Sequence, residues 1–324
     1  MIACYRCIAG TLKGTSPSTE DMRSFLRDER TILWVDFESP TEEELELLNT
    51  VFGFHPLAVE DCAEGVHTPK IDDFRRYLFV ILRTIVVSEK TLELDYPEID
   101  LFLGKHFLVT LHRTSLKGLT DFEDRIKRNP EDLIGRGADR LLAALLESIV
   151  DRYLATMEIF DERIADIEDE VFDNPTAETL QKLFRLKRQT LNLRRVLVPQ
   201  REILRRLGRE IHSLITEEYR VYFWDTYDHL VRLAELLEYY RDLISGALDA
   251  YLSVISNRIN NVMKTLTVIA TIMMPLTLIA SIYGMNFHVM PGLEMSNGFH
   301  LTLGAMGIIA TVMLILFKWK RWFW

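Results

Sequence analysis

Cysteine, proline and glycine are all scarce in this chain of 324 residues, which contains 3 Cys, 10 Pro and 15 Gly. So little Gly and Pro excludes a fibrous or low-complexity protein, and 48% hydrophobic residues are enough to form a substantial core. Three cysteines cannot all pair within one chain, and the first residues lack the basic and apolar stretches of a cleavable signal peptide. We therefore expect most of the protein to face a reducing compartment.

Acidic residues are nearly missing from residues 261–324, which contain Glu294 alone against four basic residues. Because the whole chain has a net charge of -10, residues 1–260 hold 34 basic and 47 acidic groups and carry a net charge of -13. A region this acidic would repel the phosphate backbone of a nucleic acid, so a nucleic-acid partner is excluded. The acidic region is instead expected to attract cations.

Two C-terminal runs contain no Asp, Glu, Lys or Arg: Thr265–Leu293 and Met295–Phe317. Each is longer than the roughly 20 residues that cross about 30 Å of hydrocarbon. Gly, Asn and Pro interrupt the apolar pattern between the two runs. We therefore predict membrane-spanning helices at 263–283 and 299–317, joined by an external loop at 284–298. Spans of this kind exclude a soluble enzyme.

Basic residues flank both predicted spans on the same side of the membrane: Arg258 and Lys264 before the first, and Lys318, Lys320 and Arg321 after the second. The connecting loop has no Lys or Arg, so the positive-inside rule places both termini in the cytoplasm. The tail at 318–324 also contains three tryptophans, which is typical of an aromatic belt at the membrane interface. We expect a multi-pass protein of the cell (inner) membrane, with the lipid bilayer around its spans.

Residues 1–135 are predicted to form a cytoplasmic α/β domain. The β-rich runs are Ile2–Ile8, Thr31–Phe37, Tyr77–Val87, Ile99–Leu103 and Phe107–Leu111. Thr41 and Glu44 have the spacing of a capping box that opens a helix running through Val51. Cys4 and Cys7 form a C-x-x-C pair without a second pair nearby, and ordinary packing in the first strand explains them.

Apolar residues recur at helical spacing from Ala138 onward, which predicts two antiparallel helices over 136–216. The first ends at Asn174-Pro175, and the second runs from Glu178 to about Leu207, with a bend at Pro199. A stalk helix at 217–262 follows, and no proline interrupts it before Met274. It should continue into the first span as one helix of about 67 residues, roughly 100 Å long. The predicted fold class is an α+β membrane protein.

The outer end of the first span reads Tyr283-Gly284-Met285-Asn286-Phe287, followed by Met290-Pro291. This resembles the CorA family of magnesium and cobalt channels, whose signature is Gly-Met-Asn between two C-terminal spans behind a cytoplasmic domain. Met-Pro-Leu-Thr at 274–277 and the basic, aromatic terminus add to the resemblance. It implies a homopentameric funnel through which Mg²⁺ and Co²⁺ enter the cell, with Ni²⁺ as a further candidate.

Gly284, Met285 and Asn286 are therefore the predicted entrance and selectivity residues. Mg²⁺ prefers octahedral oxygen ligands and gives up its waters reluctantly, so a ring of neutral amides can bind its hydration shell and still release it. Gly284 would allow a tight turn out of the helix. The alternative is that Asn286 simply turns the chain.

Seven residues of the first span and the end of the stalk are predicted to face the pore: Asn260, Met263, Leu266, Ala270, Met274, Thr277 and Ser281. They recur about every 3.5 residues, and lipid would disfavour the polar ones. The family resemblance selects Leu266, whereas strict spacing would select Thr267. Met263, Leu266 and Met274 would form apolar constrictions that gate by dewetting, unless they only pack helices together. Neither span contains an acid, which argues against proton-coupled transport.

The resemblance also implies regulatory Mg²⁺ between subunits, so Mg²⁺ is both the transported and the regulatory ion. The residues that correspond to its ligands are Asp61 and Asp225, with Glu60 and Glu147 at a second, weaker site. Bound cations would relieve the repulsion among acidic domains arranged in a ring and hold the channel closed. The alternative is that all four are ordinary solvated surface acids.

Two rival functions stay open at this stage. One is a proton-linked zinc transporter of the ZntB type, and the other is a membrane-tethered scaffold or signalling protein. The residues alone do not rank Mg²⁺, Co²⁺, Ni²⁺ and Zn²⁺, do not give the subunit number, and do not identify the working gate. The roles of His288 and Glu294 in the external loop are also open.

Overall fold

The computed structural model describes residues 1–8, 11–15, 18–65, 67–88, 93–210, 212–286, 290–291, 295–320 and 322. Its contacts divide the chain into two compact units. Unit 1 consists of Met1–Asp169 and Glu178–Ala247, and unit 2 consists of Glu170–Ala177 and Leu248–Trp324. Unit 1 contains the sheet and most of the helical hairpin, and unit 2 contains the apolar C-terminal helices.

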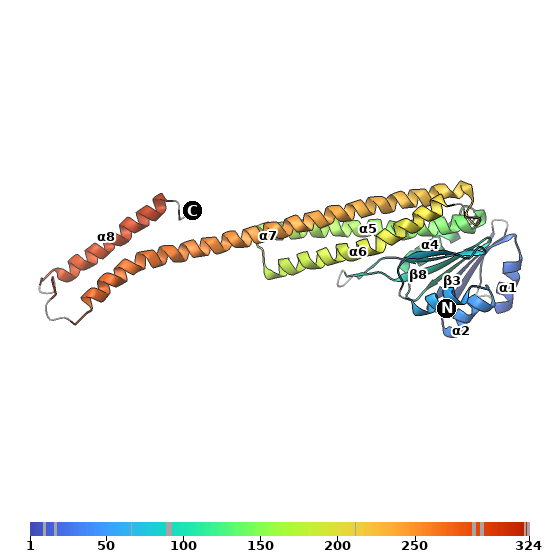
Figure 1. The fold of residues 1–324 in the computed structure, drawn as a ribbon, viewed down its shortest axis with the longest axis horizontal. Helices are drawn as coiled ribbons and strands as arrows, with labels where there is room; N and C mark the ends of the chain where they lie inside the picture. Colours follow the sequence, from blue (N-terminus) through green and yellow to red (C-terminus); the bar gives the residue numbers. More distant parts are fainter. Residues whose placement is uncertain are drawn as a thin grey trace. The chain divides into compact units, whose positions relative to one another are not determined.

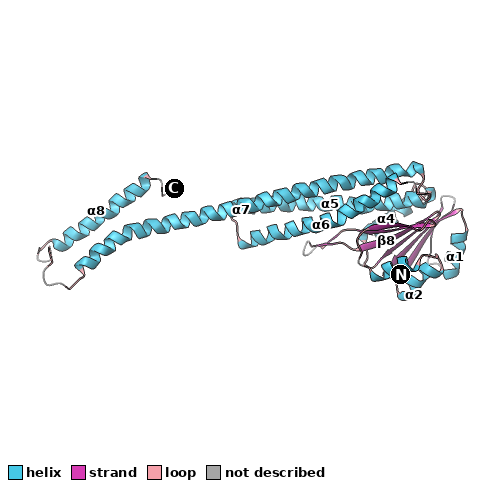
Figure 2. Ribbon diagram, in the orientation of Figure 1, coloured by secondary structure: helices cyan, strands magenta, loops and turns pink. Residues whose placement is uncertain are grey.

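A seven-stranded sheet forms the centre of unit 1, in the order β2-β1-β3-β9-β8-β5-β4 (Figure 2). Its strands are β1 (Ile2–Ile8), β2 (Thr11–Thr15), β3 (Thr31–Glu38), β4 (Lys70–Asp73), β5 (Tyr77–Arg83), β8 (Glu98–Gly104) and β9 (Phe107–His112). Strands β3 and β9 run parallel, with Leu33 opposite Phe107, and every other neighbouring pair in this sheet is antiparallel. A separate two-stranded ribbon pairs β6 (Val86–Val87) with β7 (Leu94–Asp95).

The prediction of one strand over Tyr77–Val87 is wrong, because the structure divides this run into β5 and β6. The chain leaves the sheet at Thr84, whose backbone N–H donates to the carbonyl of Pro97 at 3.0 Å. Strand β6 then pairs with β7 instead of β8. The polar strands β2 and β4 were not among the predicted strands.

Helices cover both faces of the sheet, so unit 1 is built in three layers (Figure 1). Helices α1 (Thr19–Arg27), α2 (Glu42–Thr50) and α3 (Pro56–Glu64) lie on one face, where Met22, Leu48 and Cys62 pack with sheet residues such as Phe102. On the other face, Phe122 of α4 (Lys117–Arg128) packs edge-on against Trp34 with ring centres 5.5 Å apart. The predicted capping box at the start of α2 is present.

Three long helices follow the sheet: α5 (Ala138–Asp173), α6 (Ala177–Arg209) and α7 (Arg220–Tyr283). Short 3₁₀ turns at Ile134–Arg136 and Glu217–Tyr219 precede α5 and α7. Helix α6 includes Pro199 without ending there, and α7 is a single helix of 64 residues.

Two side-chain contacts establish that α5 and α6 are antiparallel. Tyr153 is hydrogen-bonded to Gln200, and Arg163 is hydrogen-bonded to Gln189. A later residue of α5 therefore contacts an earlier residue of α6. The Tyr153 hydroxyl also donates to the carbonyl of Arg83 at 2.6 Å, which ties the hairpin to the end of β5. Burial of the apolar faces of these helices thereby extends the core of unit 1 beyond the sheet.

Unit 2 consists chiefly of the last part of α7 and helix α8 (Gly298–Trp319). Both helices are long and apolar enough to cross a membrane. Within the described part of the chain, Val268 is the only α7 residue after Tyr251 that is buried, and α8 has no buried residue. The apolar surface of unit 2 is therefore left for lipid or for other copies of the chain.

Candidate functional site

The predicted entrance residues lie directly after the last turn of α7. The backbone N–H of Gly284 still bonds to the carbonyl of Ala280 at 2.9 Å, so the chain leaves the helix at this residue. A Cβ atom at position 284 would lie 3.2 Å from that same carbonyl oxygen, which explains why glycine suits the position. Met285 and Asn286 are exposed, and the Asn286 amide makes no hydrogen bond to another described residue.

All seven predicted pore-facing residues are exposed in the chain: Asn260, Met263, Leu266, Ala270, Met274, Thr277 and Ser281. At about 100° per residue, they fall within an arc of roughly 120° around α7. Met274 is the most exposed of the three predicted constriction residues, at 73%. One continuous, open face of α7 therefore carries every predicted pore residue.

Between Val268 and Ile279, the opposite side of α7 is partly covered, and its buried or half-buried residues are Val268, Thr271, Ile272, Pro275, Leu276 and Ile279. The centre of this face lies roughly half a turn from the centre of the predicted pore face. Near the end of α7, Ala280 and Tyr283 line one cavity together with Phe299 and Thr302 of α8. Helix α8 thus occupies the side of α7 that the predicted pore residues leave free.

Some hydroxyl groups along α7 donate a hydrogen bond to the backbone of the same helix, and others do not. Thr265, Thr267 and Thr271 each donate to the carbonyl four residues earlier, at 3.0, 2.8 and 2.7 Å. The hydroxyls of Thr277 and Ser281 make no hydrogen bond to any described residue. These two hydroxyls are therefore available to water or to a hydrated ion.

Helix α3 positions the first predicted regulatory residue, Asp61, and the local sequence fixes both ends of this helix. Pro56 occupies the first turn, where its missing N–H is not needed, and Gly65 ends the helix with a positive φ of 70°. Arg113, just after β9, donates to the carbonyl of Cys62 at 2.9 Å. Asp61 is therefore presented from a helix that is anchored to the sheet.

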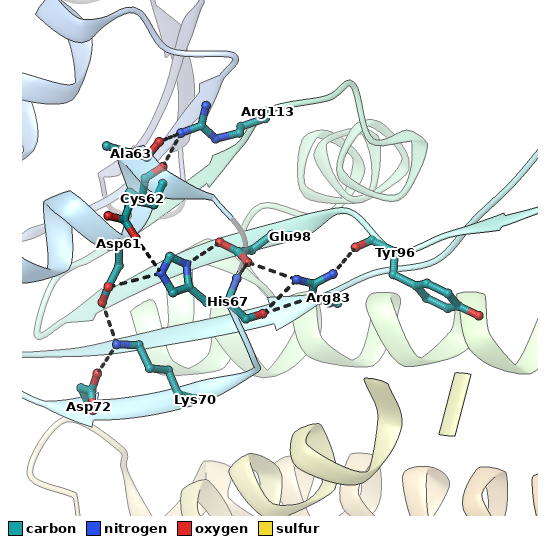
Figure 3. Close-up of polar contacts among 11 residues, drawn as sticks. Asp61, Cys62, Ala63, His67, Lys70, Asp72, Arg83, Tyr96, Glu98 and Arg113 are labelled. Atoms are coloured by element: carbon teal, nitrogen blue, oxygen red, sulfur yellow. Dashed lines mark hydrogen bonds and ion pairs between the residues drawn. The ribbon is translucent and has the colours of Figure 1, made fainter. Parts of the chain in front are cut away.

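The Asp61 carboxylate contacts Lys70 and His67 of its own chain (Figure 3). Lys70 Nζ lies 2.6 Å from Asp61 Oδ2 and 3.1 Å from Asp72 Oδ2. On the other side, His67 Nε2 lies 3.5 Å from Asp61 Oδ1, and His67 Nδ1 lies 3.4 Å from Glu98 Oε1. Burial lowers the pKa of Lys70, but its hydrogen bonds to the two aspartates raise it by more, so this amine stays charged.

A buried carboxyl, Asp100, lies on β8 close to this cluster. It is 2% exposed, its Oδ1 atom has no hydrogen-bond partner among the described residues, and it lines a cavity of about 200 Å³ together with Glu98 and Arg113. Burial, with the negative charge of Glu98 adding to it, raises the pKa of Asp100 to about 7. A hydrogen bond from Cys62 opposes this rise. Asp100 can therefore exchange a proton near neutral pH.

The other predicted regulatory acids are accessible. Asp225 lies on α7 with 68% of its side chain exposed, and His229 Nε2 is 3.9 Å from its carboxylate. Glu147 on α5 forms an ion pair with Arg125 at 3.2 Å, and Glu60 is exposed on α3. In the described part of a single chain, no group of three or more His, Cys, Asp or Glu side chains is arranged to hold a metal.

Some functional groups lie outside what the sequence predicted or the structure describes. His288 and Glu294 are outside the described residues. Lys70, His67 and Asp100 were not predicted as parts of a site. A signal existed for Asp100, because it is the only charge within the apolar run Ile99–Leu103. No comparable signal linked Lys70 to Asp61, which belongs to a different element.

Comparison with known proteins places this arrangement in a family. A model of the family described as CorA-like Mg²⁺ transporter protein matches residues 29–321. The cobalt/magnesium transport protein CorA of Thermotoga maritima is 38% identical over 307 residues, covering 94% of this chain and 88% of that protein. The chain belongs to the CorA family. Membership of the CorA family confirms that this is a transport protein with two C-terminal membrane spans, and not an enzyme.

Solved structures share the CorA fold over nearly the whole chain. The complete structure of the CorA magnesium transporter from Methanocaldococcus jannaschii matches with a TM-score of 0.84 at 22% identity, covering 98% of this chain and 97% of that one. This confirms the predicted α/β domain, long helix and two apolar helices. The ZntB cytoplasmic domain from Vibrio parahaemolyticus matches with a TM-score of 0.65 at 13% identity, covering 79% of this chain and 98% of that one. The cytoplasmic fold alone therefore does not separate the CorA and ZntB types.

Proposed function

We propose that five copies of this chain form a channel in the cell (inner) membrane that admits Mg²⁺ and Co²⁺ to the cytoplasm, where both termini lie. Ni²⁺ is a further candidate substrate. The observation that carries the proposal is that all seven predicted pore residues are exposed within one arc of α7, while the other side of the helix is buried or half-buried between Val268 and Ile279. A single chain cannot enclose a path for ions, but several copies of this exposed face can.

The entrance is assigned to Gly284, Met285 and Asn286. Asn286 follows the end of α7, and its amide is free of the other described residues, so it is available to a ligand. Several copies of this amide would offer neutral oxygens to the hydration shell of Mg²⁺. A neutral ring binds the hydrated ion weakly enough for the ion to move on.

Below the entrance, the free hydroxyls of Ser281 and Thr277 would be the next polar groups that an ion meets. Met274, Leu266 and Met263 follow as apolar constrictions, which block ions when the pore is dry and conduct when it hydrates. The membrane potential drives the flow, and it contributes about 4.6 kcal/mol per 100 mV for a divalent ion. No acid in either span is needed for this passive mechanism.

Regulation is assigned to cytoplasmic Mg²⁺ bound between subunits. Asp61 and Asp225 would hold the first ion, and Glu60 and Glu147 would contribute to a second, weaker site. The geometry of one chain supports sites that need a neighbour, because the four acids are accessible while no complete site exists among the described residues. Asp225 lies on α7, the same continuous helix that carries the pore residues. Loss of Mg²⁺ would then restore repulsion in the ring and allow the constrictions to hydrate.

The test of transport is Mg²⁺ influx into proteoliposomes that contain the purified protein and an entrapped Mg²⁺ dye. Asn286→Ala should reduce the influx at least about tenfold, because the substitution removes one amide contact with the ion from every subunit of the ring. Asn297→Ala is the matched control, because Asn297 is a second asparagine between the spans and its side chain does not cap α8. This control should conduct normally.

Zn²⁺ uptake, measured with and without a pH gradient, separates the proposal from the zinc alternative. A Mg²⁺ influx that is independent of the pH gradient supports the channel. Proton-dependent Zn²⁺ uptake without any Mg²⁺ influx would assign the protein to the ZntB type instead. Correctly assembled protein that conducts neither ion would favour the scaffold function.

A further inference from the structure

The regulatory acid Asp61 already has a cationic partner within its own chain. Lys70 Nζ donates a hydrogen bond of 2.6 Å to Asp61 Oδ2, so an external cation would have to compete with this ammonium for the carboxylate. The lysine side chain is 38% exposed and that of Asp61 is 25% exposed, so the pair is open to solvent. An incoming Mg²⁺ ion would therefore meet a carboxylate whose charge is partly neutralised.

Lys70 also has a second anionic partner within reach. Asp72 Oδ2 lies 3.1 Å from the same Nζ atom, and its side chain is 44% exposed. Lys70 and Asp72 are two residues apart on β4, so their side chains lie on the same face of the strand. The four-carbon stem of lysine is flexible, and its compact ammonium can move from one carboxylate to the other without any movement of the backbone.

We propose that Lys70 is a displaceable internal counter-ion of the regulatory site: it bridges Asp61 and Asp72 when Mg²⁺ is absent, and it releases Asp61 and stays with Asp72 when Mg²⁺ binds. The inference rests on the proposed role of Asp61 in Mg²⁺ sensing. In the empty site, the Lys70 ammonium partly neutralises Asp61 and so weakens its repulsion from other acids. In the loaded site, Asp72 keeps the released ammonium paired, which lowers the cost of the exchange.

This exchange sets the Mg²⁺ concentration at which the channel closes, because the ion must displace Lys70 before it binds Asp61. Removing the lysine charge should make Asp61 easier to occupy, so less Mg²⁺ is needed. Removing the charge of Asp72 should have the opposite effect, since Lys70 then has no second partner and stays on Asp61. Exposed ion pairs of this kind change an equilibrium by roughly two- to fivefold.

The experiment measures the Mg²⁺ concentration that gives half-maximal protection of the purified full-length protein against chymotrypsin, at one fixed pH. Chymotrypsin is chosen because it does not cut at lysine, so changing Lys70 removes no cleavage site. Lys70→Gln should lower the half-protecting concentration by about two- to fivefold, and Asp72→Asn should raise it by a similar factor. Lys70→Arg keeps the charge and should stay close to the wild type.

Asp61→Asn distinguishes failure of the inference from failure of the proposed site. If Asp61→Asn weakens protection while Lys70→Gln leaves the half-protecting concentration unchanged or raises it, Asp61 is a sensor and the counter-ion role of Lys70 is wrong. If Asp61→Asn leaves protection intact, both the sensing role of Asp61 and the inference drawn from it are wrong. The opposite signs expected for Lys70→Gln and Asp72→Asn also exclude a general loss of folding as the explanation.

Discussion

The two units of this protein differ in how far their large apolar side chains are buried. In unit 1, large side chains such as Trp34, Phe54 and Phe102 are almost completely buried in the chain's own core. In unit 2, comparable side chains such as Met274 and Leu303 stay 73% and 57% exposed. Hydrophobic burial therefore stabilises unit 1 from within, whereas unit 2 gains it only from lipid or from other copies.

The same contrast occurs along the single helix α7. Leu230, Leu237 and Ile244 are buried at about every seventh residue, against the other helices of unit 1. Past Ala247 the apolar residues continue, but Tyr251 and Val268 are the only α7 residues there that are buried in the described chain. One unbroken helix thus serves as a core element in one unit and as a surface element in the other.

The largest expected effect comes from a substitution in the core of unit 1. Phe102 stacks on Phe54 with ring centres 4.0 Å apart, and Phe102→Ala should lower the free energy of unfolding of this unit by about 3–5 kcal/mol. Leu303→Ala removes an exposed side chain of unit 2 and should cost less than about 1 kcal/mol. Urea unfolding followed by tryptophan fluorescence measures both, and equal losses would contradict the contrast between the units.

Next in size is the pH dependence that Asp100 imposes on unit 1. Its pKa is about 7 in the folded chain and near 4 when unfolded, so the folded state binds the extra proton between these values. Stability therefore falls as the pH rises from about 4 to 7. Asp100→Asn removes this loss and should raise the melting temperature by about 5 °C at pH 8, with the gain shrinking toward pH 5. A gain that is independent of pH would rule out this cause.

Substitutions of two threonines on different sides of α7 test which side of the helix faces the pore. Thr277→Val should reduce Mg²⁺ influx by roughly tenfold, because it removes a hydroxyl that is exposed on the proposed pore face. Thr271→Val removes a hydroxyl that is bonded to the carbonyl of Thr267 on the covered face, and the influx should stay within about twofold. Proteoliposome assays with matched protein amounts give the ratio. A stronger effect at Thr271 would reverse the assignment of the faces.

The smallest effect concerns helix caps. Thr41 accepts a hydrogen bond from the backbone N–H of Glu44 at the start of α2, so Thr41→Ala should cost about 1 kcal/mol in the stability of unit 1. Asn297 stands at the corresponding position of α8 without such a bond, and Asn297→Ala should change stability by less than about 0.3 kcal/mol. Thermal unfolding of the two variants beside the wild type tests this difference.

The sequence predicted the elements whose pattern is strong over a long stretch. Helical spacing indicated α5, α6 and α7, and the absence of charge identified the two spans. The short strands β2 and β4 were missed because they are polar and lie at the edges of the sheet, where one side is not packed against a neighbouring strand. The division of Tyr77–Val87 depends on a backbone bond to Pro97, which no local pattern reveals.

The candidate site was predictable only in part. The entrance and regulatory residues were named from the family resemblance, and the structure places them at exposed or partly exposed positions. The ion pair between Asp61 and Lys70 joins α3 to β4, so it exists only once the sheet has formed. Asp100 could have been noticed as a lone charge in an apolar strand, but its missing partner is a property of the tertiary structure.

Strand β4 also has a consequence for solubility. In the described sheet it pairs with β5 on one side only, so it is an edge strand that another chain could join, although Arg206 of α6 already donates to the carbonyl of Ile71 at 3.2 Å. Three of its four residues are charged: Lys70, Asp72 and Asp73. Such charges oppose the addition of a further strand, so this short element protects the sheet against aggregation through its open edge.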